Sequence, residues 1–199
     1  MENEKKQHYL STSIKKVVAT DDTIKQMVKE DIERLGLDAD LWLYDTSKVT
    51  DMSGLFRGVS RTDFTGIGSW DTSLVENMSG MFAGCESFNE DISSWNTSRV
   101  TDMSQMFDGA RSFNQPLAMW DVSSVTDMNF MFDGASSFNQ SLENWDVSGV
   151  TDMSGMFRNA SSFNQYIGKW NVSRVTDMKC MFDGAKAFNQ PLEQWDVSR

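Results

Sequence analysis

A repeat of fixed length dominates this chain. From residue 70 onward a tryptophan recurs every 25 residues, and each is followed by Asp or Asn and then by Thr-Ser or Val-Ser. The tryptophans of the repeat are Trp70, Trp95, Trp120, Trp145, Trp170 and Trp195. A unit this short cannot bury its own apolar face, so it must stack on near-copies of itself. The period therefore predicts a repeat solenoid with one coil per unit.

Each unit begins with the apolar spacing of a leucine-rich-repeat strand. In the unit over residues 142–166, Leu142, Trp145 and Val147 follow the pattern L-x-x-L-x-L, with Trp in the middle position. Period-two alternation points Trp145 and Val147 inward and leaves Asp146 on the outer, concave side. We therefore expect one short parallel strand per coil.

After this strand the apolar spacing changes from two residues to about three. Val150, Met153 and Met156 show this spacing, and Thr151 and Asp152 are candidate N-cap residues. The pattern predicts one short helical segment per coil on the convex side.

An asparagine recurs in the turn before the next strand, at positions 89, 114, 139, 164 and 189. A side-chain amide at a fixed position in every coil can bond to backbone groups of the neighbouring coil, which would otherwise be buried unpaired. We expect a structural ladder of these amides. The chain can fill a continuous core, because 39% of the residues are hydrophobic and 12% are aromatic. Trp, Phe and Met recur at the repeat period, so we expect ladders of these side chains to fill it.

The string W-D-V-S-x-V-T-D-M-x-x-M-F-x-G-A-x-S-F-N-Q resembles the repeat of BspA-like bacterial surface proteins, a leucine-rich-type family. The resemblance covers residues 41–199. It implies a right-handed β-solenoid-like array with a binding or adhesive role, at the cell surface or secreted, and no catalytic residues to transfer. Residues 45–70 depart from the pattern, because this coil has 26 residues and Arg61-Thr62-Asp63-Phe64 replaces the usual Ala-x-Ser-Phe.

Three segments are expected. Residues 1–18 are a polar extension, residues 19–40 hold an N-terminal capping helix, and residues 41–199 form a solenoid of about six to seven coils. Ile24 and Val28 lie on one apolar helical face, and such a helix would cover the first coil's open apolar edge.

Charge and hydropathy exclude two classes of partner. The net charge of −11 would repel phosphate groups, and no basic stripe compensates for it, so we expect no nucleic acid. No apolar run resembles a membrane span or a signal peptide, so we expect no membrane insertion. A cytoplasmic location is therefore the alternative to the surface or secreted location that the resemblance implies.

The residue types also argue against an enzyme. The single histidine, His8, lies in the polar extension, so no Ser-His or Cys-His arrangement can form around the repeats. No cofactor is expected. Cys85 and Cys180 lie four coils apart in different columns, and we expect both to be reduced.

Two columns of Asp and Asn could hold Ca²⁺ or could cap turns. The first contains Asp45, Asp71, Asn96, Asp121, Asp146, Asn171 and Asp196. The second contains Asp51, Asn77, Asp102, Asp127, Asp152 and Asp177. Because Asn replaces Asp in both columns, we favour a side-chain oxygen that accepts a backbone N–H over a metal site, and calcium stays an open alternative.

Variable columns on the strand face are the candidates for recognition. The candidate binding residues there are Arg99, Met119, Asn144, Lys169 and Arg174. Solenoids use such concave surfaces for partners, so we expect a non-catalytic module that binds a host or matrix protein or a glycan. A structural spacer in a longer surface array is the alternative, and ice binding through the recurrent Thr column is a weaker one.

The last strand sequence, Trp195 to Arg199, carries no helical segment or cap after it. We expect an open edge there, and hence either a longer natural array or self-association through this C-terminal edge.

Overall fold

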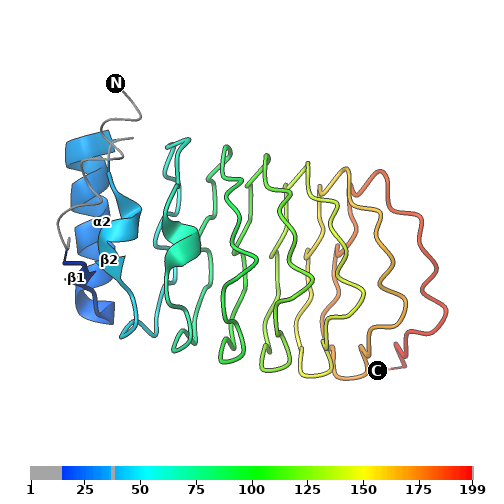
Figure 1. The fold of residues 1–199 in the computed structure, drawn as a ribbon. Helices are drawn as coiled ribbons and strands as arrows, with labels where there is room; N and C mark the ends of the chain where they lie inside the picture. Colours follow the sequence, from blue (N-terminus) through cyan, green and yellow to red (C-terminus); the bar gives the residue numbers. More distant parts are fainter. Residues whose placement is uncertain (1–14, 37–38, 199) are drawn as a thin grey trace.

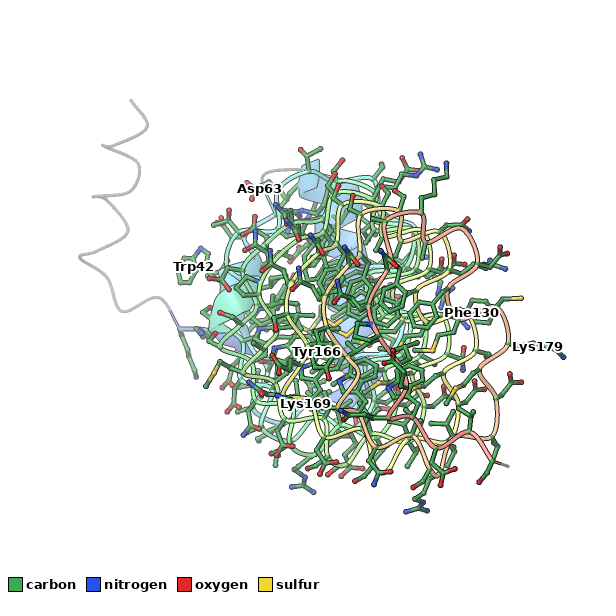
Figure 2. All side chains as sticks on the ribbon, turned by 90° about the vertical axis from the view of Figure 1, so that its right-hand side faces the viewer. Trp42, Asp63, Phe130, Tyr166, Lys169 and Lys179 are labelled. Atoms are coloured by element: carbon green, nitrogen blue, oxygen red, sulfur yellow. The ribbon has the colours of Figure 1, made fainter. Side chains whose placement is uncertain are left out.

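The computed structural model describes residues 15–36 and 39–198. Figure 1 shows coils stacked side by side along one axis, with a helix lying across the N-terminal end of the stack. Figure 2, a view along the stack, shows side chains filling the interior and projecting outward around it. The regular elements of the described residues are β1 (Val17–Val18), α2 (Asp21–Leu35), η2 (Leu41–Leu43), β2 (Tyr44–Asp45) and η3 (Ile67–Ser69). The later coils are built from turns and held together by hydrogen bonds between neighbours.

A column of parallel bridges runs along the stack at the second Asx position of the repeat. Each bridged residue pairs with its counterpart in an adjacent coil; the residues are Asp51, Asn77, Asp102, Asp127, Asp152 and Asp177. Beside Asp102, the N–H of Thr101 donates to the carbonyl of Glu76 in the preceding coil (2.8 Å), and that of Met103 donates to Asp127 in the following coil (3.0 Å). This pairing sets the register between repeats.

The structure places the pairing elsewhere than the apolar spacing predicts, because residues 142–147 form no strand. The chain makes two successive turns here: the N–H of Trp145 donates to the carbonyl of Leu142 (3.1 Å), and that of Val150 donates to Val147 (2.9 Å). These turns point backbone groups back along the chain instead of toward the neighbouring coil.

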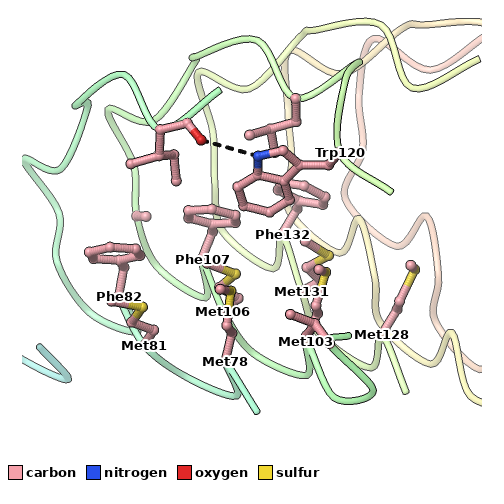
Figure 3. Close-up of a cluster of buried hydrophobic side chains, with 14 of the residues drawn as sticks. Met78, Met81, Phe82, Met103, Met106, Phe107, Trp120, Met128, Met131 and Phe132 are labelled. Atoms are coloured by element: carbon pink, nitrogen blue, oxygen red, sulfur yellow. Dashed lines mark hydrogen bonds between the residues drawn. The ribbon is translucent and has the colours of Figure 1, made fainter. Parts of the chain in front are cut away.

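The tryptophan side chain makes a recurrent coil-to-coil hydrogen bond in this region. The indole N–H of Trp120 donates to the carbonyl of Ile92 in the preceding coil at 3.1 Å (Figure 3), and every tryptophan of the repeat does the same. The predicted directions hold: Trp145 and Val147 are buried, and Asp146 between them is exposed. The spacing therefore predicts the inward pattern correctly, although it predicts the strand wrongly.

The helical segment expected in each coil is also absent over residues 150–163, which form a run of turns. Met153, Gly155 and Phe157 donate their N–H groups to carbonyls of the next coil at 2.8–2.9 Å, whereas Met156 donates to Met153 three residues earlier (3.1 Å). Gly155 has φ of 60°, which an α-helix does not allow. Successive turns advance by about three residues, so they give the same apolar spacing as a helical segment.

The expected ladders of aromatic side chains are present in the core. The rings of Phe107 and Phe132 in adjacent coils are stacked with centroids 5.5 Å apart, and those of Trp95 and Trp120 are 6.4 Å apart. Figure 3 shows the row of Phe82, Phe107 and Phe132 with methionines packed beside it. These distances lie in the range in which aromatic pairs add about 0.5–1.5 kcal/mol beyond burial.

The predicted asparagine ladder is confirmed. Asn114 accepts the N–H of Asn139 on Oδ1 (2.9 Å), and Asn139 accepts the N–H of Asn164 in the same way (3.0 Å). The amide of Gln140 donates to both the carbonyl and the Oδ1 of Asn114 (3.1 Å each). Side chains thus supply acceptors along the edge where the turns return to the next tryptophan.

Helix α2 supplies the first coil with contacts that a preceding coil supplies elsewhere. Ile24 and Val28 are fully buried against the core. The carboxylate of Asp21 accepts the N–H of Thr50 (2.7 Å), its hydroxyl (2.6 Å) and the N–H of Asp51 (3.0 Å). In later coils the corresponding Thr N–H donates to a backbone carbonyl, so Asp21 takes the place of that carbonyl.

Two N-terminal details differ from the repeat. Residues 17 and 18, which the composition assigns to the polar extension, form β1, which pairs in parallel with β2. In the 26-residue coil, Arg61 is buried and donates to the carbonyls of Gly36 and Ala39 (3.2 Å each). Phe64 occupies the usual core position and meets Phe56 edge-on, with centroids 5.3 Å apart.

Candidate binding face

The turn before each tryptophan and the turn after it expose two columns of variable side chains. The first column contains Ser69, Ser94, Met119, Asn144, Lys169 and Gln194. The second contains Lys48, Leu74, Arg99, Ser124, Gly149 and Arg174. Between them runs the column of Asp and Asn residues that directly follow the tryptophan position, which we call the Asx column; it contains Asp45, Asp71, Asn96, Asp121, Asp146 and Asn171. These three columns form what we call the Trp-side face.

All five candidate residues lie on this face, at its exposed or half-exposed positions. Met119, Asn144 and Lys169 occupy one position in three consecutive coils, so the structure brings an apolar, an amide and a cationic side chain into one row. Met119 is 85% exposed, which is exceptional among the large apolar side chains of the described residues. Arg99 and Arg174 lie in the other column three coils apart, about 14 Å along the stack at the usual strand spacing.

Two of the candidate cations pair with carboxylates in the preceding coil. Arg99 meets Glu76 at 3.1 Å, and the ammonium of Lys169 meets Glu143 at 2.6 Å. The ammonium of Lys169 also lies 6.0 Å from the ring centroid of Tyr166. Such exposed pairs contribute little to stability, so they orient the side chains without locking them.

The Asx column of this face has a structural role. Oδ1 of each residue accepts the N–H of the serine two positions later, as in Asp71 to Ser73 (2.9 Å) and Asn171 to Ser173 (3.2 Å). Hydrogen bonds from that serine, from its side chain and its N–H, hold the pKa of Asp71 and Asp146 below its usual range. These two aspartates therefore stay charged to a lower pH than free aspartates do.

The second Asx column makes the same turn at the bridge positions. Oδ1 of Asp102 accepts the N–H of Ser104 (2.9 Å), and Oδ1 of Asn77 accepts that of Ser79 (2.8 Å). These bonds support the interpretation that both columns cap turns. Within residues 15–36 and 39–198, no three His, Cys, Asp or Glu side chains are arranged to hold a metal ion.

Sequence reasoning missed two features of the surface. Tyr166 stands where other coils have Asp91, Pro116 or Ser141, and its ring packs over Gly168 beside Lys169. Phe130 occupies a turn position where three other coils have glycine. Each is the one aromatic residue in a column of small or polar residues, which is the signal that could have identified them.

Other groups considered for chemistry lie apart from the Trp-side face or outside the described residues. His8 falls in the part of the chain that is not described. Cys85 is buried and Cys180 is exposed, and both are free thiols. A hollow of about 370 Å³ lies between α2 and the first coil, lined in part by Ile32, Leu55 and Val59. Among the described helices, none has the length and apolar character needed to cross a membrane.

Comparison with family profiles matches residues 22–142 and 116–199 to one family, described as "Mycoplasma protein of unknown function, DUF285". The two matches overlap and together span most of the chain, including α2 and the coils. Searches of curated proteins and of solved structures gave no match. The chain therefore belongs to the DUF285 family.

Proposed function

We propose that this chain is a solenoid of the leucine-rich-repeat type that serves as a non-catalytic binding module. Its Trp-side face, which the sequence predicts to be the concave one, recognises a protein or a glycan of a host or matrix. The observation that supports this proposal is that the recurrent and the variable columns of the repeat have different roles. The recurrent Trp, Asx and Asn side chains are engaged in hydrogen bonds that build the coils, whereas the two variable columns are exposed.

The row formed by Met119, Asn144 and Lys169 supports recognition of a polar ligand with an apolar part. Met119 offers a flexible thioether surface, which adapts to differently shaped partners. Asn144 and Lys169 add hydrogen-bond donors in the next two coils, and the ring of Tyr166 borders Lys169. Together they form a mixed surface rather than a uniform charged one.

The relation to BspA-like surface proteins supports an adhesive role at the cell surface or after secretion. This relation rests on the repeat string of residues 41–199, and a cytoplasmic location is the alternative.

A binding screen with a matched charge control tests the proposal. The wild-type chain and the triple variant Arg99→Ala, Met119→Ala, Arg174→Ala would be applied to one array of host glycans and matrix proteins. The control carries Arg111→Ala and Lys186→Ala, which remove the same net charge away from the Trp-side face. We expect the triple variant to lose the binding that the wild type and the control show, at an unchanged melting temperature.

Two results would contradict the proposal. Binding that survives in the triple variant places the site on another surface. A wild-type chain that binds nothing specific on the array favours the alternative, a structural spacer whose only role is stacked length.

We also propose self-association with a second copy at the C-terminal edge. A hollow of about 200 Å³ lined by Val175, Thr176, Met178 and Val197 lies there, and Val197 is 65% exposed. Sedimentation over a hundredfold concentration range should show association that Val197→Asp weakens; a constant monomer would contradict it.

A further inference from the structure

A second surface, distinct from the Trp-side face, departs from the repeat. In the run of turns that follows each bridge, one position has positive φ in every coil; its residues are Gly54, Gly80, Gln105, Phe130, Gly155 and Cys180. Their φ angles lie between 51° and 61°. Glycine adopts this conformation without steric cost, whereas a bulky side chain does not. We call this column the turn ridge.

Phe130 is the largest side chain on the turn ridge and is strained. Its φ is 51°, and its N–H still donates to the carbonyl of Ser154 in the next coil (2.8 Å). The ring is half-buried and lies over Gly155, where an added Cβ would be 2.3 Å from Cε1 of the ring. The N–H groups of Gly80 and Gly155 donate to the next coil in the same way, so the coil-to-coil hydrogen bond does not need this ring.

A fixed arginine lies beside the ring. The guanidinium carbon of Arg158 is 5.0 Å from the ring centroid of Phe130. Its Nη2 and Nε donate to one carboxylate oxygen of Asp133 at 2.5 and 3.0 Å, and Asn159 donates to the other oxygen at 3.2 Å. Asp133 is only 6% exposed. Arg158 is thus held in one orientation with its side chain 40% exposed.

The departures from the repeat converge on this cluster. Asn159 also has positive φ (56°), at a position where the other coils have glycine. Two residues in a backbone conformation that favours glycine therefore lie within contact of Asp133 and Arg158. Strain of this kind persists where the surrounding structure enforces it, and it is typical of sites that bind.

We propose that Phe130 and Arg158 form a docking point for a protein segment that presents a carboxylate next to an apolar side chain. Asp133 engages Nε and Nη2 of Arg158, so the two N–H groups on Nη1 can bind an incoming carboxylate. The ring of Phe130 offers an apolar contact beside that point. Aromatic and arginine side chains dominate the energetics of protein interfaces, most of all when they are already oriented.

This docking point does not rest on the proposed function, since it lies on a different part of the surface. Figure 2 shows Phe130 and Lys179 on one side of the stack, away from Tyr166 and Lys169. Variants of one surface therefore leave the other unchanged.

Two synthetic peptides test the docking point on the full chain. The first, acetyl-Gly-Asp-Leu-Gly-amide, carries the carboxylate and the apolar group; the second replaces its Asp by Asn. NMR titration would follow the Nε–H signal of Arg158 and the ring signals of Phe130. We expect saturable binding of the Asp peptide and at least tenfold weaker binding of the Asn peptide.

Three variants separate docking from folding. Phe130→Gly should lose the Asp peptide and raise the urea midpoint, because the strain disappears. Arg158→Lys keeps the charge but loses the planar fork, and should weaken binding of the Asp peptide at least tenfold. Gln105→Gly, the matched control, relieves the same backbone strain one coil away and should leave binding unchanged.

The proposal is overturned by equal affinity for the two peptides, by no saturable binding of the Asp peptide, or by a lower urea midpoint in Phe130→Gly. Shifts at Arg158 with heparin but not with the Asp peptide would equally overturn it, in favour of an anionic glycan.

Discussion

Each tryptophan of the repeat contributes both a stacked ring and a hydrogen bond. The ring of Trp120 stacks on Trp95, and its indole N–H donates to the carbonyl of Ile92 at 3.1 Å within the core. The same carbonyl also accepts the N–H of Trp95 (3.1 Å), so the indole supplies one of its two hydrogen bonds, which contributes about 0.5–1.5 kcal/mol. The indole therefore joins adjacent coils at a position where their backbones do not pair.

Trp120→Phe keeps an aromatic ring but removes the indole donor, so we expect the free energy of unfolding to fall by about 0.5–1.5 kcal/mol, with a further loss from the smaller ring. Trp195→Phe is the matched variant, since Trp195 makes the same bond to Ile167 (3.1 Å) but is only half-buried. Its cost should be smaller. Urea denaturation measures both, and equal losses at the two positions would contradict this account.

The Asx turns predict acid sensitivity. Because hydrogen bonds from Ser148 lower the pKa of Asp146 in the folded chain, the carboxylate stabilises the fold fully above the unfolded pKa of about 3.9. That contribution is lost as the pH falls through the lower folded pKa. Burial raises the pKa of Asp108 and Asp127, so these two groups work in the opposite direction.

Asp146→Asn should retain the turn, because Asn171 accepts the same N–H in its own coil, and should lose part of the acid dependence. We expect a smaller drop in melting temperature between pH 7 and pH 2 than in the wild type, with little change at pH 7. Glu193→Gln removes the same charge at an exposed position outside any helix and serves as control. A drop identical to the wild type's would show that Asp146 does not titrate as described.

Among the elements, α2 supplies the hydrogen-bond acceptor that the first coil lacks on its open side, through the carboxylate of Asp21. Asp21→Ala removes the acceptor for two N–H groups and one hydroxyl of the first coil, so we expect a loss of about 1–3 kcal/mol in the free energy of unfolding. Asp22→Ala removes a carboxylate from the same helical turn, where the helix dipole contributes about 0.3–1 kcal/mol. Urea denaturation compares the two, and a larger loss for Asp22→Ala would contradict the ladder role of Asp21.

The sequence predicted which residues face inward more reliably than it predicted the elements. Trp145 and Val147 are buried as the alternation indicated, because side-chain direction follows from spacing. The expected helical segment is absent over residues 150–163, because an apolar spacing of three fits successive turns as well as a 3₁₀ helix. The strand expected at residues 142–147 is replaced by two turns, whereas the first coil does have a strand, β2. Gly155 carried the deciding information, since positive φ in mid-segment is incompatible with a helix.

The candidate site was predictable only as a surface. Exposure of Met119 and Asn144 follows from the alternation around the tryptophan column. The pairs of Arg99 with Glu76 and of Lys169 with Glu143 depend on the offset between coils, which a single repeat does not reveal.

For the whole molecule, stacking with contacts between neighbouring coils predicts that one coil can be removed. Deletion of residues 117–141 joins Pro116 to Leu142 in register, so we expect a folded chain whose urea m-value falls with the smaller surface exposed on unfolding. Deletion of residues 117–129, about half a coil, breaks the register and should abolish cooperative unfolding. If the half-coil deletion unfolded cooperatively and the one-coil deletion did not, the account of coils that contact only their neighbours would be contradicted.

The most direct test of the coil register is an NMR scalar coupling across hydrogen bonds. The structure pairs the N–H of Phe107 with the carbonyl of Met131, and that of Phe132 with the carbonyl of Met156, each at 2.9 Å. We predict couplings between the amide nitrogens and carbonyl carbons of these two pairs. Couplings from Phe107 to Met103 and from Phe132 to Met128, four residues back, would instead show the helical segments and contradict the stack of turns.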